Sequence, residues 1–257
     1  MNTQALRRGK LAPVFLSLFL AASLFAQDKS KEPTATLTKS EAKAFKAFDA
    51  IPISEVDNKV KSAQDFIKKF PNSPFLSRVY ADLAVTYIQS NQQDQGFAAG
   101  EKALSLNPND ARTLANLAQA MARSSNSTPA QLQTSEQYAQ KAVQLIPTLP
   151  KLEGSTDKEF PTEDNQTLAE AHSALGTIKI RRNQFAQAIP DLQEAVRLDT
   201  TKDGTNYYLL AVANDNASHF PEAVDAYTKC AALPGNLQKP CRDRAAELQK
   251  QLPGAKP

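Results

Sequence analysis

The sequence predicts an all-α fold class, built as an α-solenoid of stacked antiparallel helix pairs. The first observation is periodicity, because apolar residues recur at steps of three and four over 80–87, which gives a helix one buried face. The second is repetition, since the same two-helix spacing, about 34 residues per unit, returns three times downstream. The third is that Val, Ile, Thr and Tyr never alternate over a strand-length run flanked by turn signals.

The clearest repeat unit lies between Tyr80 and Pro108. Its first helix has large and small residues on one stripe, and its second helix has small residues along the stripe that must approach a neighbouring backbone. Three further copies follow, although Lys179 and Asn214 replace the expected aromatic. The anchors of the four copies are Tyr80, Leu83, Ala84, Tyr87, Gly96, Gly100 and Ala103; Leu114, Leu117, Ala118, Met121, Ser135, Ala139 and Ala142; His172, Leu175, Gly176, Lys179, Ala188, Leu192 and Ala195; and Tyr207, Leu210, Ala211, Asn214, Ala223, Tyr227 and Cys230.

This arrangement resembles that of tetratricopeptide repeat proteins and covers roughly residues 73–235, although no copy has the leading Trp. An ordinary helical bundle with chance periodicity is the alternative interpretation, and four copies in one chain argue against it. The resemblance implies a right-handed superhelix whose concave surface is lined by the first helix of each pair. Such a groove is suited to an extended or helical peptide from a protein partner.

The first 26 residues are expected to be a secretory signal peptide. Three basic residues precede an uncharged apolar run over 11–26, which closes on small residues. Because the run is shorter than the roughly 20 residues that span a bilayer, an uncleaved membrane anchor is the second interpretation. Without this segment the chain has 27 basic and 27 acidic residues, and no cluster of Lys and Arg supplies the basic face that nucleic acid requires.

Residues 27–37 are polar and predict a flexible lead-in, and a degenerate capping pair is expected over 38–71. Repeats are expected at about 74–110, 111–147, 166–200 and 204–235, with a surface loop inserted at 148–162 and a carboxyl-terminal cap helix at 240–252. Several residues have the chemistry of helix starts. These expected helix starts are Thr38 with Glu41, Ser54 with Asp57, Ser73 with Pro74, Asp110, Thr128 with Pro129, Thr162 and Pro240.

The groove candidates are side chains on the first helices that lie next to the buried anchors and so point to the concave side. They are mixed in chemistry, which suits a peptide backbone and carboxylates, whereas a sugar site would favour stacked aromatics and the chain has no Trp. Ordinary solvated helix faces are the alternative interpretation of the same residues. The candidates are Arg112, Asn116, Gln119 and Arg123; Ser173, Thr177 and Arg181; and Tyr208, Val212 and Asp215.

No catalytic, metal or cofactor constellation is evident in the sequence. His172 and His219 fall in different repeats and do not form a pair at metal-ligand spacing. His172 is expected at a buried anchor position and His219 in a turn. Glycine-rich phosphate loops and the GxSxG and HExxH motifs are absent from the sequence. We therefore expect neither a cofactor nor an enzymatic activity.

Cys230 and Cys241 are the one chemically suggestive pair. Cys230 ends the fourth copy, and Cys241 begins the cap helix that should pack beside it. In an exported protein such a pair is expected to oxidise to a structural disulfide, with two buried thiols as the alternative.

The sequence therefore predicts an exported scaffold, periplasmic or secreted, that binds a peptide segment of a partner protein in its concave groove. Two alternatives stay open: a binder of a non-protein ligand such as a cell-wall fragment or lipid, and a regulatory subunit of an enzyme complex. A membrane contact is expected only through an uncleaved signal segment. The oligomeric state is not predicted.

Overall fold

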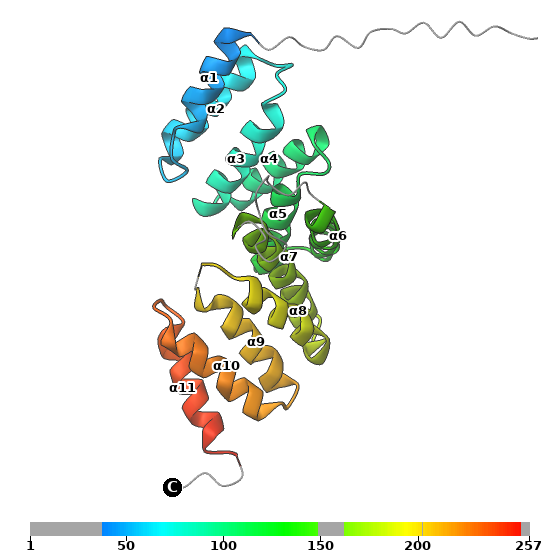
Figure 1. Cartoon of the computed structure of the whole chain (residues 1–257), viewed down its shortest axis with the longest axis vertical. Helices are drawn as coiled ribbons and strands as arrows, with labels where there is room; N and C mark the ends of the chain where they lie inside the picture. Colours follow the sequence, from blue (N-terminus) through cyan, green and yellow to red (C-terminus); the bar gives the residue numbers. More distant parts are fainter. Residues whose placement is uncertain (1–37, 149–161, 202, 253–257) are drawn as a thin grey trace, which may run out of the picture. The chain divides into compact units, whose positions relative to one another are not determined.

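The computed structural model describes residues 38–148, 162–201 and 203–252. These ranges fold into eleven α-helices and one short 3-10 turn, with no strand among them, which confirms the all-α solenoid class (Figure 1). The helices are α1 (Lys39–Asp49), α2 (Val56–Lys69), α3 (Leu76–Gln89), α4 (Gln93–Leu106), α5 (Ala111–Arg123), α6 (Pro129–Leu145), α7 (Thr162–Arg181), α8 (Phe185–Leu198), α9 (Gly204–Asn216), α10 (Phe220–Ala232) and α11 (Gln238–Gln249).

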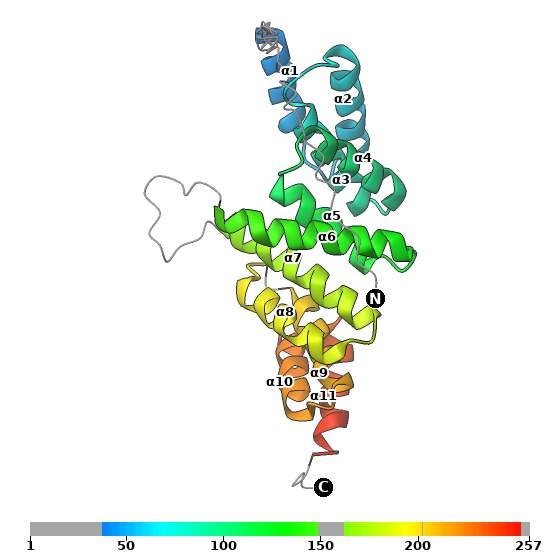
Figure 2. The same cartoon turned by 90° about the vertical axis from the view of Figure 1, so that its right-hand side faces the viewer.

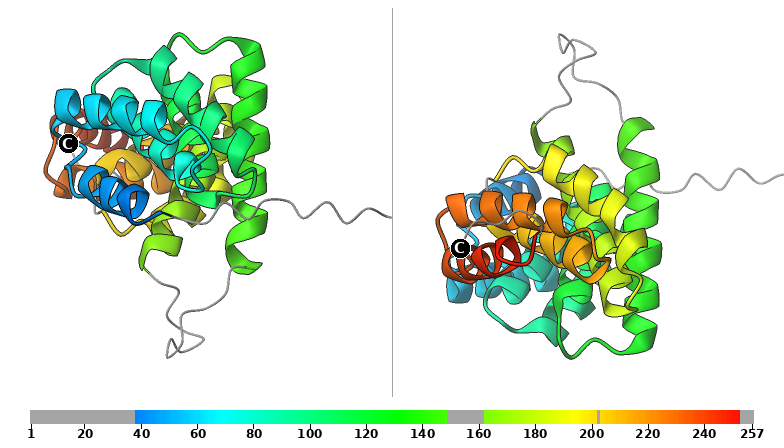
Figure 3. Two further views of the ribbon diagram at one scale, coloured as in Figure 1. Left: turned by 90° about the horizontal axis from the view of Figure 1, so that it is seen from above. Right: turned by 90° about the horizontal axis from the view of Figure 1, so that it is seen from below.

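Consecutive helices pack as pairs, and each pair packs on the next. The closest partners are α3 with α4, α5 with α6, α7 with α8, and α9 with α10. Between pairs, α5 and α6 both pack against α7, and α8 packs against α9, as Figure 2 shows. The last helix, α11, lies against α10 (Figure 3). By contrast, α3 and α5 make few direct contacts, which leaves room between them.

The leucine anchors of the repeats lie in the core. Leu83, Leu117 and Leu175 are buried, and Leu210 is partly buried. Each buried leucine contributes about 1.5–3 kcal/mol through removal of its side chain from water. The small residue Gly100 allows α4 to approach α5, because a β-carbon there would lie 2.5 Å from Leu117 Cδ2.

The turns between the helices of a pair repeat the same geometry. Asn91, Asn183 and Ser218 all have a left-handed backbone, with φ of 62°, 58° and 63°. The N–H of the residue after each one donates to the carbonyl five residues earlier, as from Gln92 to Tyr87. Asparagine tolerates this conformation better than most residues. The connection between α5 and α6 differs, since it contains the extra residues 124–128.

Three expected caps are confirmed, at α1, α5 and α6. The side chain of Thr38 accepts from the Glu41 N–H at 3.1 Å. The side chain of Asp110 accepts from the Thr113 N–H at 3.3 Å. Thr128 and Gln131 form a reciprocal capping box around Pro129, the first residue of α6. Each such cap stabilises its helix by about 1 kcal/mol.

Three expected helix starts are wrong. Glu55, rather than Ser54, precedes α2, and it makes no side-chain cap. The Ser73 hydroxyl accepts from the Phe75 N–H at 3.1 Å, a local turn that competes with helix and delays α3 to Leu76. Helix α11 starts before Pro240, which is tolerated because the first N–H groups of a helix have no intrahelical acceptor.

Several sequence expectations fall outside the described residues. These are the signal peptide at 1–26, the lead-in at 27–37 and nearly all of the inserted loop at 148–162. Within the described part of the chain, no helix is both long and apolar enough to cross a membrane.

Candidate peptide groove between α3, α5 and α7

Two adjoining cavities follow the space between α3 and α5 and continue toward α7. The first has a volume of about 180 Å³ and the second about 340 Å³. They share Val85, Ile88 and Asn116, so they form one continuous depression, which we call the α3–α5 groove. Its three helices succeed one another as the first members of their pairs (Figure 1).

The α3–α5 groove combines an apolar floor with a polar edge. Aliphatic side chains such as Val85 and Leu117 line its base, and the edge has amide and charged groups such as Arg78 and Asn116. Binding sites commonly have this composition, because apolar contact supplies affinity while a few polar groups fix orientation. The amides can donate to and accept from a peptide backbone.

A buried lysine holds one edge of the groove in place. Lys59, from α2, is 1% exposed, and its Nζ lies 3.1 Å from Asp82 Oδ2 and donates to the Phe48 carbonyl at 3.1 Å. The ammonium also lies 3.9 Å from the centroid of the Phe48 ring. Arg78 pairs with the other oxygen, Asp82 Oδ1, at 3.1 Å. Asp82 therefore lines the groove with its carboxylate already paired with two cations, Lys59 and Arg78.

The α7 end of the groove contains a charged cluster. Arg123 Nη2 donates to Ser173 Oγ at 3.1 Å and so ties α5 to α7. Glu170 accepts a hydrogen bond from Gln166 Nε2 at 3.3 Å. Desolvation raises the pKa of the Glu170 carboxyl, although the Gln166 bond and the charges of Arg123 and Arg112 oppose this change. Desolvation likewise lowers the pKa of Arg123, and Asp203, Glu170 and Asp199 oppose it.

The structure brings together only part of the predicted set. The α5 members Arg112, Asn116, Gln119 and Arg123 all line the groove. The α7 members do not face it. Ser173 and Thr177 are buried, and Arg181 donates to the carbonyls of Ala122 and Ser124 at 3.1 and 2.6 Å.

The α9 members lie away from the groove, beside the carboxyl-terminal helices. Tyr208 and Val212 pack against the cluster of α10 and α11, and Tyr208 meets Tyr227 edge to face. Asp215 accepts from Arg244 of α11 at 2.8 and 3.1 Å. These residues join α9 to the last described helix, so α11 covers the face that the repeat pattern assigned to the groove.

Sequence reasoning missed Asp82 and Glu170, two acidic groups of the groove. Asp82 directly precedes the anchor Leu83, and Glu170 lies two residues before the anchor His172. Both therefore have the helical phase of groove residues, and that spacing was the available signal. The burial of Lys59 behind Asp82 had no such signal, because its position in α2 reads as an exposed basic residue.

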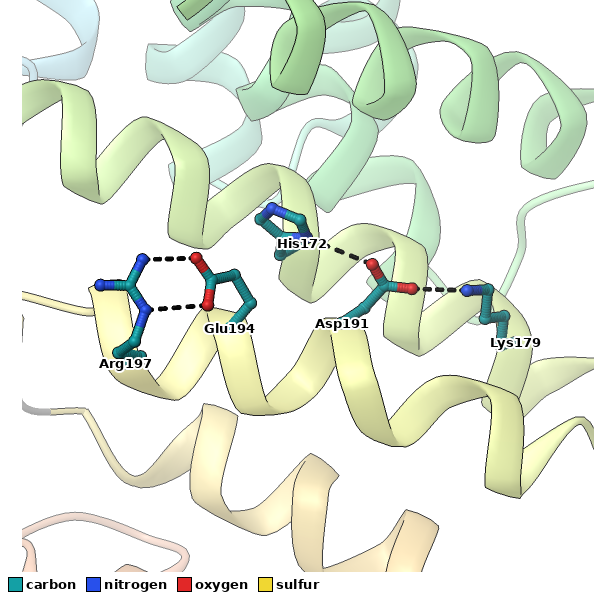
Figure 4. A network of polar contacts seen from close by, with 5 residues as sticks. All are labelled: His172, Lys179, Asp191, Glu194 and Arg197. Carbon is teal, nitrogen blue, oxygen red and sulfur yellow. Dashed lines mark hydrogen bonds and ion pairs between the residues drawn. The ribbon is translucent and has the colours of Figure 1, made fainter. Parts of the chain in front are cut away.

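His172 takes part in a clamp between α7 and α8 (Figure 4). It was expected to be a buried anchor, but its side chain is 17% exposed and its Nδ1 lies 3.2 Å from Asp191 Oδ1. Lys179 Nζ lies 2.5 Å from the other oxygen, Oδ2. Desolvation raises the pKa of Asp191, but the hydrogen bonds and charges of His172 and Lys179 lower it by more. The net result is a pKa below the ordinary value for an aspartate. The exposed Glu194–Arg197 pair lies on α8, as Asp191 does.

Cys230 and Cys241 form a disulfide between α10 and α11. Their Cα atoms are 5.9 Å apart, and both residues are buried. Elsewhere in the described residues, no group of three His, Cys, Asp or Glu side chains is arranged to hold a metal ion.

The tetratricopeptide repeat family matches residues 77–110, and no curated protein matches the chain. Solved structures share the fold. Pseudomonas aeruginosa pilF is 18% identical with a TM-score of 0.57, and the alignment covers 83% of this chain and 92% of pilF. PilW, a type IV pilus biogenesis factor, is 16% identical with a TM-score of 0.56, at 84% and 93% coverage.

A third neighbour is TTC0263, a thermophilic tetratricopeptide repeat protein of Thermus thermophilus. It is 15% identical with a TM-score of 0.52, and the alignment covers 81% of this chain and 98% of TTC0263. These identities are too low to transfer a binding partner, and they show the shared fold alone. The chain is therefore an all-α solenoid that carries a tetratricopeptide repeat at residues 77–110.

Proposed function

We propose that this chain is a protein-interaction scaffold that binds a peptide segment of a partner protein in the α3–α5 groove. The observation that carries the proposal is the continuity of the two cavities through Val85, Ile88 and Asn116. A continuous depression with an apolar floor suits a linear segment better than a compact small molecule. The segment's backbone would pair with the amides of Asn116 and Gln119.

The groove is also rigidly supported, which favours binding. Lys59 and Arg78 hold Asp82 on one edge, and the Arg123–Ser173 bond ties α5 to α7 at the other end. A preformed site loses less conformational freedom when the ligand binds, so more of the contact energy becomes affinity.

We further propose that the protein is exported. The apolar segment over 11–26 has the composition of a signal peptide, and the Cys230–Cys241 disulfide is of the kind that persists in oxidising compartments. Expression of the full chain with cell fractionation tests this. We expect a shortened chain in the exported fraction with both cysteines oxidised. Retention of the full-length chain in the cytoplasm would contradict it.

Site-specific photo-crosslinking tests the groove. A photoreactive residue replaces Gln119, which lines the second cavity, and in a matched variant it replaces Gln137, an exposed residue of α6. We expect partner adducts from position 119 but not from position 137. An added Asn116→Ala substitution should reduce the adducts. Equal adducts from both positions would refute the groove assignment.

A further inference from the structure

The carboxylate of Glu170 is poorly satisfied for its surroundings. It is half-buried at the α7 end of the α3–α5 groove, and Gln166 Nε2, at 3.3 Å, is its one hydrogen-bond donor among the described residues. No described lysine or arginine forms an ion pair with it. A carboxylate that has lost much of its water without gaining a close cation is costly to the folded protein. It is a candidate for completion by a ligand.

The charges around Glu170 come from three elements. Arg112 and Arg123 of α5 favour its ionised form from a distance, and Asp199, at the end of α8, disfavours it. The guanidinium of Arg123 donates to Ser173 and, among the described residues, forms no ion pair with the Glu170 carboxylate. Asp203 lies near enough to act on Arg123 as well. The position facing Glu170 in the cavity therefore remains available to a further cation.

The walls beside Glu170 suit a long basic side chain. Val85, Ile88 and Ala120 line the same cavity and offer aliphatic surface. Lysine and arginine cover such surface with their methylene stems while the charged end reaches a polar group. The cavity volume of about 340 Å³ is ample for one such side chain. The neighbouring Gln89 and Gln119 would remain free to pair with the peptide backbone.

We infer that the α3–α5 groove selects a peptide segment with a lysine or arginine whose stem lies on Val85, Ile88 and Ala120 and whose cation pairs with Glu170. This inference rests on the proposed function. It assigns Glu170 as the residue that determines specificity. It also defines the partner segment, which has a basic side chain at one position and pairs its backbone with the groove on either side of that position. Charge-assisted hydrogen bonds are stronger than neutral ones, so this single pair can dominate selection.

A random peptide library selected on the full-length chain tests the inference. We expect the enriched peptides to share a lysine or arginine at a fixed position. The affinity of one such peptide should fall about tenfold or more in the Glu170→Gln variant, and to a similar extent when its basic residue becomes glutamine. Combining the two changes should cost little more than either alone. The control Glu101→Gln removes the same charge from the exposed face of α4 and should leave the affinity unchanged.

The outcomes separate this inference from the proposed function. Enriched peptides that lack a basic residue, or that bind Glu170→Gln as well as wild type, overturn the inference. If those peptides still lose affinity in an Asn116→Ala/Gln119→Ala variant, the groove itself is upheld. If no peptide is enriched, or if binding survives the Asn116→Ala/Gln119→Ala change, both the groove and the basic-residue assignment fall.

Discussion

Gly176 of α7 and Leu192 of α8 are packed so closely that a β-carbon on the glycine would lie 2.4 Å from Leu192 Cγ. Leu192 is fully buried, so it has no free space into which it can move. The contact fixes the distance between the two helices of this pair. The repeat pattern predicted a small residue at Gly176 for this purpose.

Gly176→Ala should destabilise the protein by about 1–3 kcal/mol, even though alanine is the better helix former, because the core must shift around Leu192. Gly176→Leu should cost more. Urea unfolding followed by circular dichroism measures the change. Gly204→Ala is the control, since its nearest neighbour, the Cys230 carbonyl oxygen, would lie at an ordinary 3.4 Å. Equal stability of the two alanine variants would refute the packing argument.

Asp191→Asn should destabilise the protein by about 1–3 kcal/mol at neutral pH, because the clamp from His172 and Lys179 loses its charge. The folded-state pKa of Asp191 lies below its ordinary value of 3.8, so its stabilisation is present above that value and disappears as the pH falls through the lowered pKa. The difference between wild type and variant should therefore shrink in acid.

Unfolding free energies of both proteins from neutral pH to below about pH 4 measure this effect. Glu194→Gln is the control, because the Glu194–Arg197 pair is exposed and should contribute about 0–1 kcal/mol. A constant difference between wild type and Asp191→Asn across this range would count against the clamp.

Lys59→Ala should cost about 3–5 kcal/mol, because it leaves Asp82 with only Arg78 beside it and opens a gap against Phe48. Thermal and urea unfolding measure the loss. Lys61→Ala, an exposed position in the same helix, should change stability by less than about 0.5 kcal/mol. A comparably small effect for Lys59→Ala would mean that the buried ion pair contributes nothing.

Replacing both Cys230 and Cys241 by alanine should destabilise the protein by about 3 kcal/mol, the value expected when a loop of this length is no longer closed in the unfolded chain. Reducing agent should lower the unfolding midpoint of the wild type and leave the double variant unaffected. Identical midpoints with and without reductant would show that the bond does not stabilise the fold.

The fold was predictable because the spacing of buried residues and the capping residues of each repeat can be recognised within a short stretch of sequence. The spacing of Leu83, Leu117 and Leu175 follows from which helix face is buried, and Asp110 and Thr128 are caps whose chemistry acts within three residues. Ser54 and Ser73 have the same chemistry but do not cap a helix. At Ser73 a local turn competes with the helix, which residue type alone does not reveal.

The candidate site was predictable only where neighbouring helices repeat regularly. The α5 residues Asn116 and Gln119 line the groove as their spacing indicated. Tyr208 and Asp215 have equivalent spacing, yet α11 covers them, and the sequence does not say how a terminal helix docks. The role that we propose for Glu170 depends on the removal of water around its carboxyl, which is a property of the assembled helices rather than of the residue.

The disulfide between α10 and α11 also makes the two ends of the described helical array unequal in local stability. Because solenoids are held together by nearest neighbours, disorder spreads inward from the less secure end. The first described helix, α1, has no disulfide to its neighbours and is held by packing such as the stacking of Phe45 on Phe75. Backbone amides of α1 should therefore exchange with deuterium well before those of α11, so that the two ends differ in lifetime although both are edges of one array.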